Sequence, residues 1–333
     1  MRRALLKLVA FGLSLLLAVL AAALWWLHHP MALHTPTVEL SVELGQSPRE
    51  VARAWVEAGV DGSSWGLYQW FRVSGQARQI RAGNYELSAP VTPRSLLAKL
   101  VAGDETLSRV RLGEGWTFRQ VREELNRTPG LKQDSAGLSD AQLMAALGRP
   151  GQMPEGRFFP DTYAFAKGSS DLALLERAHR AMAHRLDTAW SQRVSGLPLA
   201  TADEALALAS IVEKETGRAA DRAQVAGVFV NRLRLGMPLQ TDPTIIYGLG
   251  TEFDGDLRRR DLLRDGPYNT YTRTGLPPTP IAMPGRDALM AVLRPARTNA
   301  LYFVSRGDGS SEFSETLADH NRAVNRYQRG RTP

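Results

Sequence analysis

The sequence predicts an α+β fold in three parts: an N-terminal transmembrane helix, a small α+β domain and a larger α+β domain. First, the run from Leu8 to Leu27 carries no charge and, as a helix, is long enough to cross a bilayer core of about 30 Å. Second, short strand patterns alternate with capped helices along the rest of the chain. Third, a glycine- and proline-rich stretch at 148–154 indicates a domain boundary. The predicted parts are residues 1–29, 30–150 and 151–333.

The composition excludes several chemistries. The 333 residues include no cysteine, which rules out disulfides, a cysteine nucleophile and cysteine-ligated zinc. His179 and His184 do not have the i, i+4 spacing of a helical metal pair, so we expect no metal and no cofactor. The net charge of +7 comes mostly from scattered arginines and suits an anionic lipid surface or an acidic polymer. No helix-turn-helix, zinc-finger or RNA-binding signature accompanies it, so nucleic acid is not an expected partner.

The charges at the start of the chain predict how the first helix lies in a membrane. The basic start at 1–3 precedes the apolar run, and Trp25 and Trp26 follow in the manner of an interfacial aromatic belt. This pattern predicts a single-pass helix in the cytoplasmic (inner) membrane, with its N-terminus in the cytoplasm and the rest on the periplasmic or extracytoplasmic side. The alternative is a signal peptide cleaved near Ala21–Ala23. The apolar run exceeds the usual ~7–15 residue signal core, which favours an uncleaved anchor.

The small domain is predicted from repeated strand–turn–helix units. Alternation over 37–44 indicates a strand, and Ser47 with Glu50 marks the start of a helix as a near capping box. The segment from Gly45 is echoed by the segment from Gly115. Such a small α+β module resembles LysM-type carbohydrate-binding units. The predicted strands are 81–87 and 109–112 besides the first, and the predicted helices are 48–58, 64–73, 93–102, 118–126 and 140–147.

The larger domain is predicted to be mainly helical, with one hairpin near its end. Pro243 favours an extended Asp242, so a polar loop is expected there. The proline-rich segment 275–280 is expected to form a rigid extended wall. The predicted helices are 172–190, 205–216, 222–235, 287–293 and one carrying His320, and the hairpin strands are 301–304 and 312–314.

One carboxylate in this domain lies where a core or a cleft is expected. At about 100° per residue, Leu208, Ile211 and Val212 share one stripe of the helix 205–216, and Glu215 falls in the middle of that stripe. Glu213 falls on the other side. Burial raises the pKa of a carboxylic acid, which lets it stay protonated and serve as a general acid. The alternative is a helix end where Glu215 meets solvent or a salt bridge.

Residues that suit a carbohydrate groove follow this helix. Gln240, Asp242 and Asn269 could hydrogen-bond sugar hydroxyls, while aromatic rings could stack on sugar faces. Those rings are Phe159, Tyr247, Tyr268 and Tyr271. Each also has a structural interpretation, since Asn269 could satisfy a loop backbone and the tyrosines could fill a core.

A serine hydrolase is the other enzymatic hypothesis. The segment 62–66 matches the letters of a nucleophile elbow. It follows no apolar strand and lies at a helix start, so Ser63 or Ser64 is better interpreted as a helix N-cap.

From Glu155 to Tyr327 the chain resembles the YceG-like endolytic murein transglycosylases, and the anchor and the LysM-like region match the layout of that family. Thr279 and Met283 depart from its pattern. The segments that carry the resemblance are 155–163 (EGRFFPDTY), 209–216 (ASIVEKET), 228–233 (VFVNRL), 239–248 (LQTDPTIIYG), 268–271 (YNTY), 275–278 (GLPP) and 281–285 (IAMPG).

The resemblance implies a catalytic domain that cuts the β-1,4 bond between N-acetylmuramic acid and N-acetylglucosamine inside peptidoglycan strands without water. It implies that Glu215 is the catalytic acid and then the base, and that the product ends in 1,6-anhydromuramic acid. It implies action beside peptidoglycan synthases (penicillin-binding proteins), where it would end growing strands. The substrate-binding residues expected within the matching segments are Glu155, Asn231, Gln240, Asp242, Tyr247, Asn269 and Tyr271.

Two alternatives remain. One is a hydrolytic muramidase in which Glu215 works with a second carboxylate, Asp242 or Glu155. The other is a non-catalytic, membrane-anchored scaffold that binds glycan.

Overall fold

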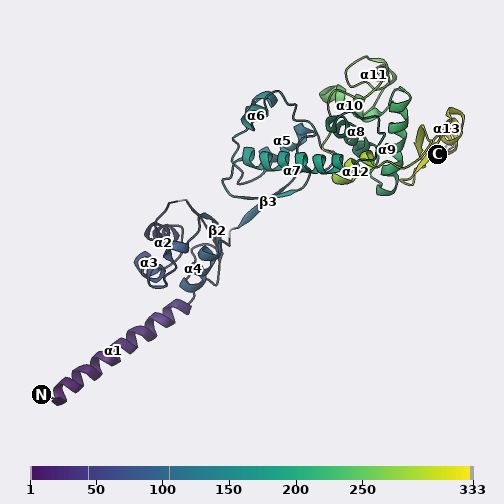
Figure 1. Cartoon of the computed structure of the whole chain (residues 1–333). Helices are drawn as coiled ribbons and strands as arrows, with labels where there is room; N and C mark the ends of the chain where they lie inside the picture. The colour runs from purple at the N-terminus through teal and green to yellow at the C-terminus, as the bar shows by residue number, and fades with distance from the viewer. Residues whose placement is uncertain (1, 44, 105, 331–333) are drawn as a thin grey trace. The chain divides into compact units, whose positions relative to one another are not determined.

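The structure, a computed structural model, describes residues 2–43, 45–104 and 106–330 (Figure 1). Met1 of the basic start, Leu44 of the first predicted strand and 331–333 of the last predicted part lie outside the described residues. Contacts divide the chain into unit 1, Met1–Ser108, and unit 2, Arg109–Pro333. Helices and two-stranded sheets together give the mixed α+β fold that the sequence predicts.

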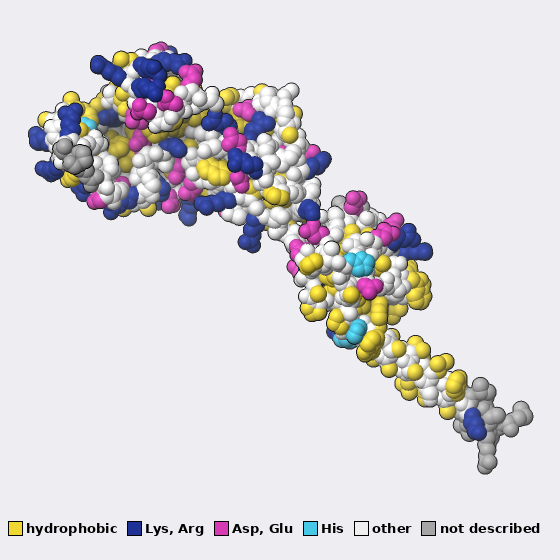
Figure 2. Space-filling model, turned by 180° about the vertical axis from the view of Figure 1, so that it is seen from behind, with side chains coloured by type: hydrophobic (Ala, Val, Ile, Leu, Met, Phe, Trp, Pro, Cys, Tyr) yellow, Lys and Arg dark blue, Asp and Glu magenta, His cyan; other side chains and the backbone are white. Residues whose placement is uncertain are grey.

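The first helix, α1 (Arg2–His28), is apolar along most of its length. Its window Val9–His28 has 20 residues and a mean hydropathy of 2.2, and none of it is buried within the described chain. Figure 2 shows the helix as a largely hydrophobic surface. By length and composition alone, α1 is able to cross a membrane, which is consistent with a single-pass anchor. A signal sequence near an N-terminus passes the same test.

An antiparallel pair of strands organises the core of unit 1. β1 (Thr37–Val42) pairs with β2 (Gly83–Ser88), and Val38 lies opposite Leu87 on the buried side of the pair. The core is completed by large apolar side chains from the helices, including Trp55. Those helices are α2 (Pro48–Glu57), α3 (Ser64–Val73) and α4 (Pro93–Ala102), with a short 3₁₀ turn, η1 (Ala77–Gln79).

Serine caps start two of these helices, as the sequence predicts. Ser47 accepts a hydrogen bond from the backbone of Glu50, whose side chain accepts one from the Ser47 backbone in return, which completes a capping box. Ser63 accepts a hydrogen bond from the Gly66 backbone at the start of α3. The serine in the segment 62–66 is therefore a helix cap, and the strand that a nucleophile elbow requires does not precede it.

The first half of unit 2 packs residues from both sides of the predicted boundary at 150 into one core. Val121 and Leu143 lie in the same cluster as Phe158 and Leu175. The division into compact units therefore falls at Ser108, and the stretch 148–154 is a loop inside unit 2. The elements of this half are β3 (Leu107–Arg111), β4 (Thr162–Ala166), α5 (Phe118–Arg127), α6 (Asp140–Ala146) and α7 (Asp171–Ser191), with β3 paired to β4.

The second half of unit 2 is built around α8 (Ala202–Glu215). Every residue from Ala205 to Val212 is buried, because α7, α9, α10 and α12 all contact this helix. Alanines at every second or third position let those neighbours approach on all sides. The other elements are α9 (Ala219–Arg234), α10 (Asp242–Leu249), η2 (Gly250–Glu252), α11 (Arg259–Leu263), α12 (Arg286–Leu293), β5 (Tyr302–Ser305), β6 (Ser311–Ser314), α13 (Leu317–Val324) and η3 (Asn325–Arg329), with β5 and β6 forming the predicted hairpin.

The prediction of a polar loop around Asp242 is wrong, because α10 begins there. Thr241 is the N-cap residue and Pro243 lies in the first turn. Proline is tolerated in that turn because the first backbone N–H groups of a helix have no partner inside the helix. The proline-rich segment 275–280, in contrast, contains neither helix nor strand, as predicted.

A buried carboxylate joins α7 to the loop before α6. Asp171 is fully buried, and it accepts hydrogen bonds from the Ser135 backbone N–H at 3.0 Å and 3.2 Å and from the Ser135 hydroxyl. Since the site is shielded from solvent, removal of the carboxylate leaves the Ser135 donors unsatisfied.

We predict that Asp171→Ala lowers the free energy of unfolding by about 2–4 kcal/mol, measured by urea denaturation. The control is Glu176→Ala on the same helix, which removes an exposed i,i+4 ion pair with Arg180 and is expected to cost less than about 0.5 kcal/mol. Equal effects of the two substitutions would contradict this role of Asp171.

Candidate active site

Glu215 is the last residue of α8, and its carboxyl group meets the loop that leads into α10. It is partly buried, and the Thr241 hydroxyl donates a hydrogen bond to its Oε1. Thr241 is itself held, because its backbone N–H donates to the hydroxyl oxygen of Thr270 at 3.1 Å. The carboxyl position is therefore set by a chain of hydrogen bonds from a second loop.

The surroundings of Glu215 favour its protonated form. Burial raises the pKa of its carboxyl group, the hydrogen bond from Thr241 acts in the opposite direction, and the negative charge of Asp242 adds to the rise. Asp242 is exposed and accepts a hydrogen bond of 2.6 Å from the Tyr271 hydroxyl. Burial, then Asp242, also raise the pKa of Tyr271. The site thus contains an acid that holds its proton above the usual pH range of a glutamic acid.

Glu213 has different partners, two residues earlier on the same helix. Its Oε2 accepts a hydrogen bond of 2.9 Å from the Gly285 backbone N–H at the start of α12, and its Oε1 lies 3.8 Å from Arg222. The two carboxylates face different surroundings, as predicted. The side of α8 that carries Glu213 is also covered, since Leu206 on that side is fully buried.

The loop beside Glu215 contains a backbone conformation that non-glycine residues rarely adopt. Gln240 has a φ of +52°, held by its backbone N–H, which donates to the Thr270 carbonyl at 3.0 Å. Its side-chain oxygen accepts a hydrogen bond of 3.2 Å from Arg232. Such conformations persist where surrounding contacts enforce them, and they are frequent at functional sites. Gln240 and Asp242 thereby flank the residue that contacts Glu215.

Two of the predicted binding residues use their amides inside the protein. The Asn269 side chain donates to the carbonyls of Leu262 and Arg264 at 3.0 Å and 2.8 Å and accepts from the Tyr271 N–H at 2.8 Å. Asn231 donates to the carbonyls of Thr298 and Ala300 at 2.8 Å and 3.1 Å. In this structure both amides therefore position loops.

Glu155 links the start of α5 to α10. It is buried, and it accepts hydrogen bonds from the Phe118 N–H at 3.0 Å and from the Tyr247 hydroxyl at 3.1 Å. Burial raises the pKa of Glu155 to about 7, although both hydrogen bonds act against that rise. Glu155 and Tyr247 thus meet each other, as part of a cleft wall.

This wall belongs to a cleft of about 1000 Å³ between α5 and α10 in unit 2. Lys214, directly before Glu215, and Pro243, directly after Asp242, both line it. Glu215 is not itself among the lining residues, so the cleft lies beside the carboxyl group. The cleft is lined by Thr117, Phe118, Arg119, Gln120, Arg122, Glu123, Asn126, Asp140, Met153, Pro154, Glu155, Lys214, Pro243, Ile246, Tyr247, Gly250, Phe253, Tyr268 and Ile281.

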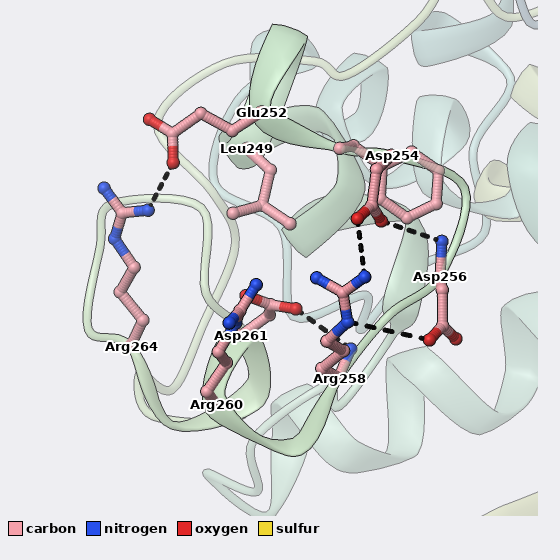
Figure 3. A pocket seen from close by; sticks show the side chains of 9 residues that line it. Leu249, Glu252, Asp254, Asp256, Arg258, Arg260, Asp261 and Arg264 are labelled. Atoms are coloured by element: carbon pink, nitrogen blue, oxygen red, sulfur yellow. Dashed lines mark hydrogen bonds and ion pairs between the residues drawn. The ribbon is translucent and has the colours of Figure 1, made fainter.

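A smaller cavity of about 310 Å³ lies between α10 and α11 and is lined mostly by charged side chains (Figure 3). Each arginine in it has a carboxylate partner: Arg258 pairs with Asp254 and Asp256, Arg264 with Glu252 and Arg260 with Asp261. Because these charges are already paired with one another, none is left to attract a charged ligand. This cavity is therefore a weaker candidate for a binding site than the cleft.

The structure adds residues that the sequence did not single out. Thr241 lies between two predicted residues, and its contact with Glu215 depends on loop geometry that spacing cannot show. Arg232 is buried and donates to the carbonyls of Leu301 and Leu239 at 2.7 Å and 3.0 Å. It occurs in the segment 228–233, where a charged residue among apolar ones was the available signal.

We predict a pH effect on stability from Glu155. Its pKa is raised from 4.5 to about 7, so its contribution to stability is greatest below pH 4.5 and is lost as the pH rises to about 7, by about 3 kcal/mol at most. Glu155→Gln should remove much of this decline, measured as the free energy of unfolding at several pH values. Parallel curves for the wild type and the variant would contradict the assignment.

Comparisons with known proteins cover most of the chain. The YceG-like family model matches residues 40–326. A Bacillus subtilis protein named endolytic murein transglycosylase is 30% identical over 310 residues, which cover 87% of this chain and 85% of that protein. A protein with the same name from Streptococcus pneumoniae strain D39 is 27% identical over 323 residues, which cover 86% of this chain and 58% of the relative. This chain therefore spans little more than half of the streptococcal protein.

A solved structure is also similar to this chain. The crystal structure of a YceG-like protein from Listeria monocytogenes has a TM-score of 0.53 and 28% sequence identity to this chain. The match covers 86% of this chain and 98% of that one. The residues matched by the family model include α8, α10 and the loops around Glu215. This chain belongs to the YceG-like family.

Proposed function

We propose that this protein is a membrane-anchored endolytic lytic transglycosylase of peptidoglycan. The observation that carries the proposal is the partly buried Glu215, whose pKa is raised and whose carboxyl group is fixed by Thr241 beside a large cleft. The relatives named endolytic murein transglycosylase support the substrate class. The bond cut would be the β-1,4 bond between N-acetylmuramic acid and N-acetylglucosamine inside a strand.

In the first step, protonated Glu215 gives its proton to the glycosidic oxygen. The bond from that oxygen to C1 of the muramic acid then breaks, and positive charge develops at C1. A carboxylic acid with a raised pKa is suited to this task, and burial raises the pKa of Glu215. The Thr241 hydroxyl holds the carboxyl group in one orientation.

In the second step, the Glu215 carboxylate takes the proton from the 6-hydroxyl of the same sugar. O6 then forms a bond to C1, which gives the 1,6-anhydro ring and returns Glu215 to its protonated form. No water is consumed, and the leaving strand carries the proton given in the first step. One carboxylate therefore acts as acid and then as base.

The neighbouring residues have supporting roles in this proposal. Gln240, Asp242 and Tyr271 would contact sugar hydroxyls beside Glu215, and Tyr247 with Glu155 would contact the part of the substrate that enters the cleft. Asn231 and Asn269 would act by positioning the surrounding loops, because their amides are engaged there.

The rest of the chain would bring the site to new glycan. α1 would anchor the protein in the cytoplasmic membrane with the N-terminus inside, which places unit 2 on the periplasmic or extracytoplasmic side. The LysM-like part of unit 1 would bind glycan. Peptidoglycan synthases release strands at that surface, so the enzyme would act beside penicillin-binding proteins and end strand growth.

Hydrolysis is the second candidate, because Asp242 is a second carboxylate close enough to Glu215 to influence its pKa. A hydrolytic muramidase would use it to direct water to C1. Mass spectrometry of the digest separates the two reactions: the proposal expects 1,6-anhydromuramic ends, and reducing ends alone would establish hydrolysis.

We predict that Glu215→Gln lowers the rate of cleavage of purified sacculi by about 10²–10⁴-fold, because the amide cannot exchange the proton. Circular dichroism should show an unchanged fold. Glu213→Gln is the matched control on the same helix: it keeps an acceptor for Gly285 and should retain activity within a few-fold. A greater loss in Glu213→Gln than in Glu215→Gln would refute the assignment.

The pH dependence gives a further prediction. Activity should fall as the pH rises through the raised pKa of Glu215, because the acid form is needed first. Thr241→Val removes the hydrogen bond that lowers this pKa, so the alkaline limb of kcat/KM should move to higher pH. A limb that stays in place or moves to lower pH would contradict this role of Thr241.

A further inference from the structure

We propose that the cleft between α5 and α10 binds the acidic stem peptide carried by the glycan, and that Arg119 and Lys214 recognise its carboxylates. This inference rests on the proposed function, since the stem peptide is the part of peptidoglycan that hangs from the muramic acid. It adds a specificity site for peptide-bearing strands to a site that otherwise recognises sugars.

The position of the cleft suits this ligand. Two of the residues that line it, Lys214 and Pro243, are the sequence neighbours of Glu215 and Asp242. A strand bound at Glu215 would therefore bring its stem peptide near the cleft. A volume of about 1000 Å³ lies at the upper end of the range of ligand pockets and leaves room for several amino acids.

Two of the three cationic side chains that line the cleft, Arg119 and Lys214, are available to a ligand. Arg119 is exposed, and its guanidinium group takes part in no hydrogen bond or ion pair within residues 2–43, 45–104 and 106–330. Lys214 is exposed, and its Nζ donates to the Gly115 carbonyl at 3.3 Å, which leaves its charge without a carboxylate partner in the described chain. An arginine or lysine in this state favours a carboxylate ligand.

The acids of the cleft do not cancel these two charges. Asp140 is 3.1 Å from Arg122, and Glu123 is 3.2 Å from Arg127, so both are balanced by a cation. Glu155 has a pKa raised to about 7 and accepts hydrogen bonds from the protein, which reduces its charge at neutral pH. The cleft therefore presents a surplus of positive charge.

The opposite wall is apolar, which suits the alanine side chains and the backbone of a short peptide. It is formed by α10 and the loop that follows, with Ile246 and Phe253 among its residues. In contrast to this cleft, the cavity of Figure 3 pairs each of its arginines with a carboxylate. The cleft is thus complementary to an acidic, partly apolar peptide.

The test compares glycan strands that carry stem peptides with strands from which an amidase has removed them. The full-length protein is assayed as wild type, as Arg119→Gln and as Arg180→Gln, a control on α7 whose exposed side chain pairs with Glu176 and does not line the cleft. The wild type should cleave peptide-bearing strands with the lower KM. Arg119→Gln should raise that KM by about 5–10-fold and bring the ratio of the two substrates close to one, whereas Arg180→Gln should keep the wild-type ratio.

Equal KM values of the wild type for both substrates, or an unchanged ratio in Arg119→Gln, would overturn the inference. The same loss in Arg180→Gln would also overturn it, because net charge alone would then explain the effect. Failure to cleave either substrate would instead refute the proposed function. Binding of a soluble stem tetrapeptide, compared with its carboxamide by titration calorimetry, tests the cleft in that case: equal affinities for the two would overturn the inference.

Discussion

The burial of one carboxyl group at the end of α8 is the constraint on which the site depends. Four helices cover α8, so its last turn emerges at a point that is partly shielded from water. There the loop before α10 brings Thr241 to Glu215. A carboxyl group in such surroundings holds its proton at higher pH than an exposed one, and it can then act as an acid. The packing around α8 thus raises the pKa of one residue, Glu215.

The loops around this carboxyl group are held by a few polar contacts. Gln240 is kept at positive φ by its bond to the Thr270 carbonyl, and Asn269 fixes the second loop through backbone groups. Arg232 holds the first loop by donating hydrogen bonds to the carbonyl oxygens of Pro238 and Leu239. Residues that look like ligands for a substrate can therefore contribute by fixing geometry. The cleft beside them supplies room. Arg119 and Lys214, which have no carboxylate partner among the described residues, would give it a preference for anions.

The sequence was sufficient for much of this account. Helix caps such as Ser47 predicted where helices start, and the helical period of the apolar residues in α8 singled out Glu215. Both signals are local in the sequence. The resemblance in ordered motifs indicated the family. The predicted domain boundary at 150 differs from the observed division at Ser108, because a loop rich in glycine and proline can also connect two segments that share one core. The contact with Thr241 and the clamping role of Asn269 could not be predicted, since they depend on loops that meet only after folding.

The central claim is that Glu215 is the group that acts on the glycosidic bond. A crystal structure of Glu215→Gln with a peptide-bearing glycan strand tests it most directly, because that substitution keeps the shape of the side chain. We expect the side-chain amide that replaces the carboxyl group to lie within about 3 Å of the glycosidic oxygen, with the muramic acid 6-hydroxyl close by. A strand placed with the carboxylate of Asp242 or Glu155 nearest to that oxygen would contradict the claim.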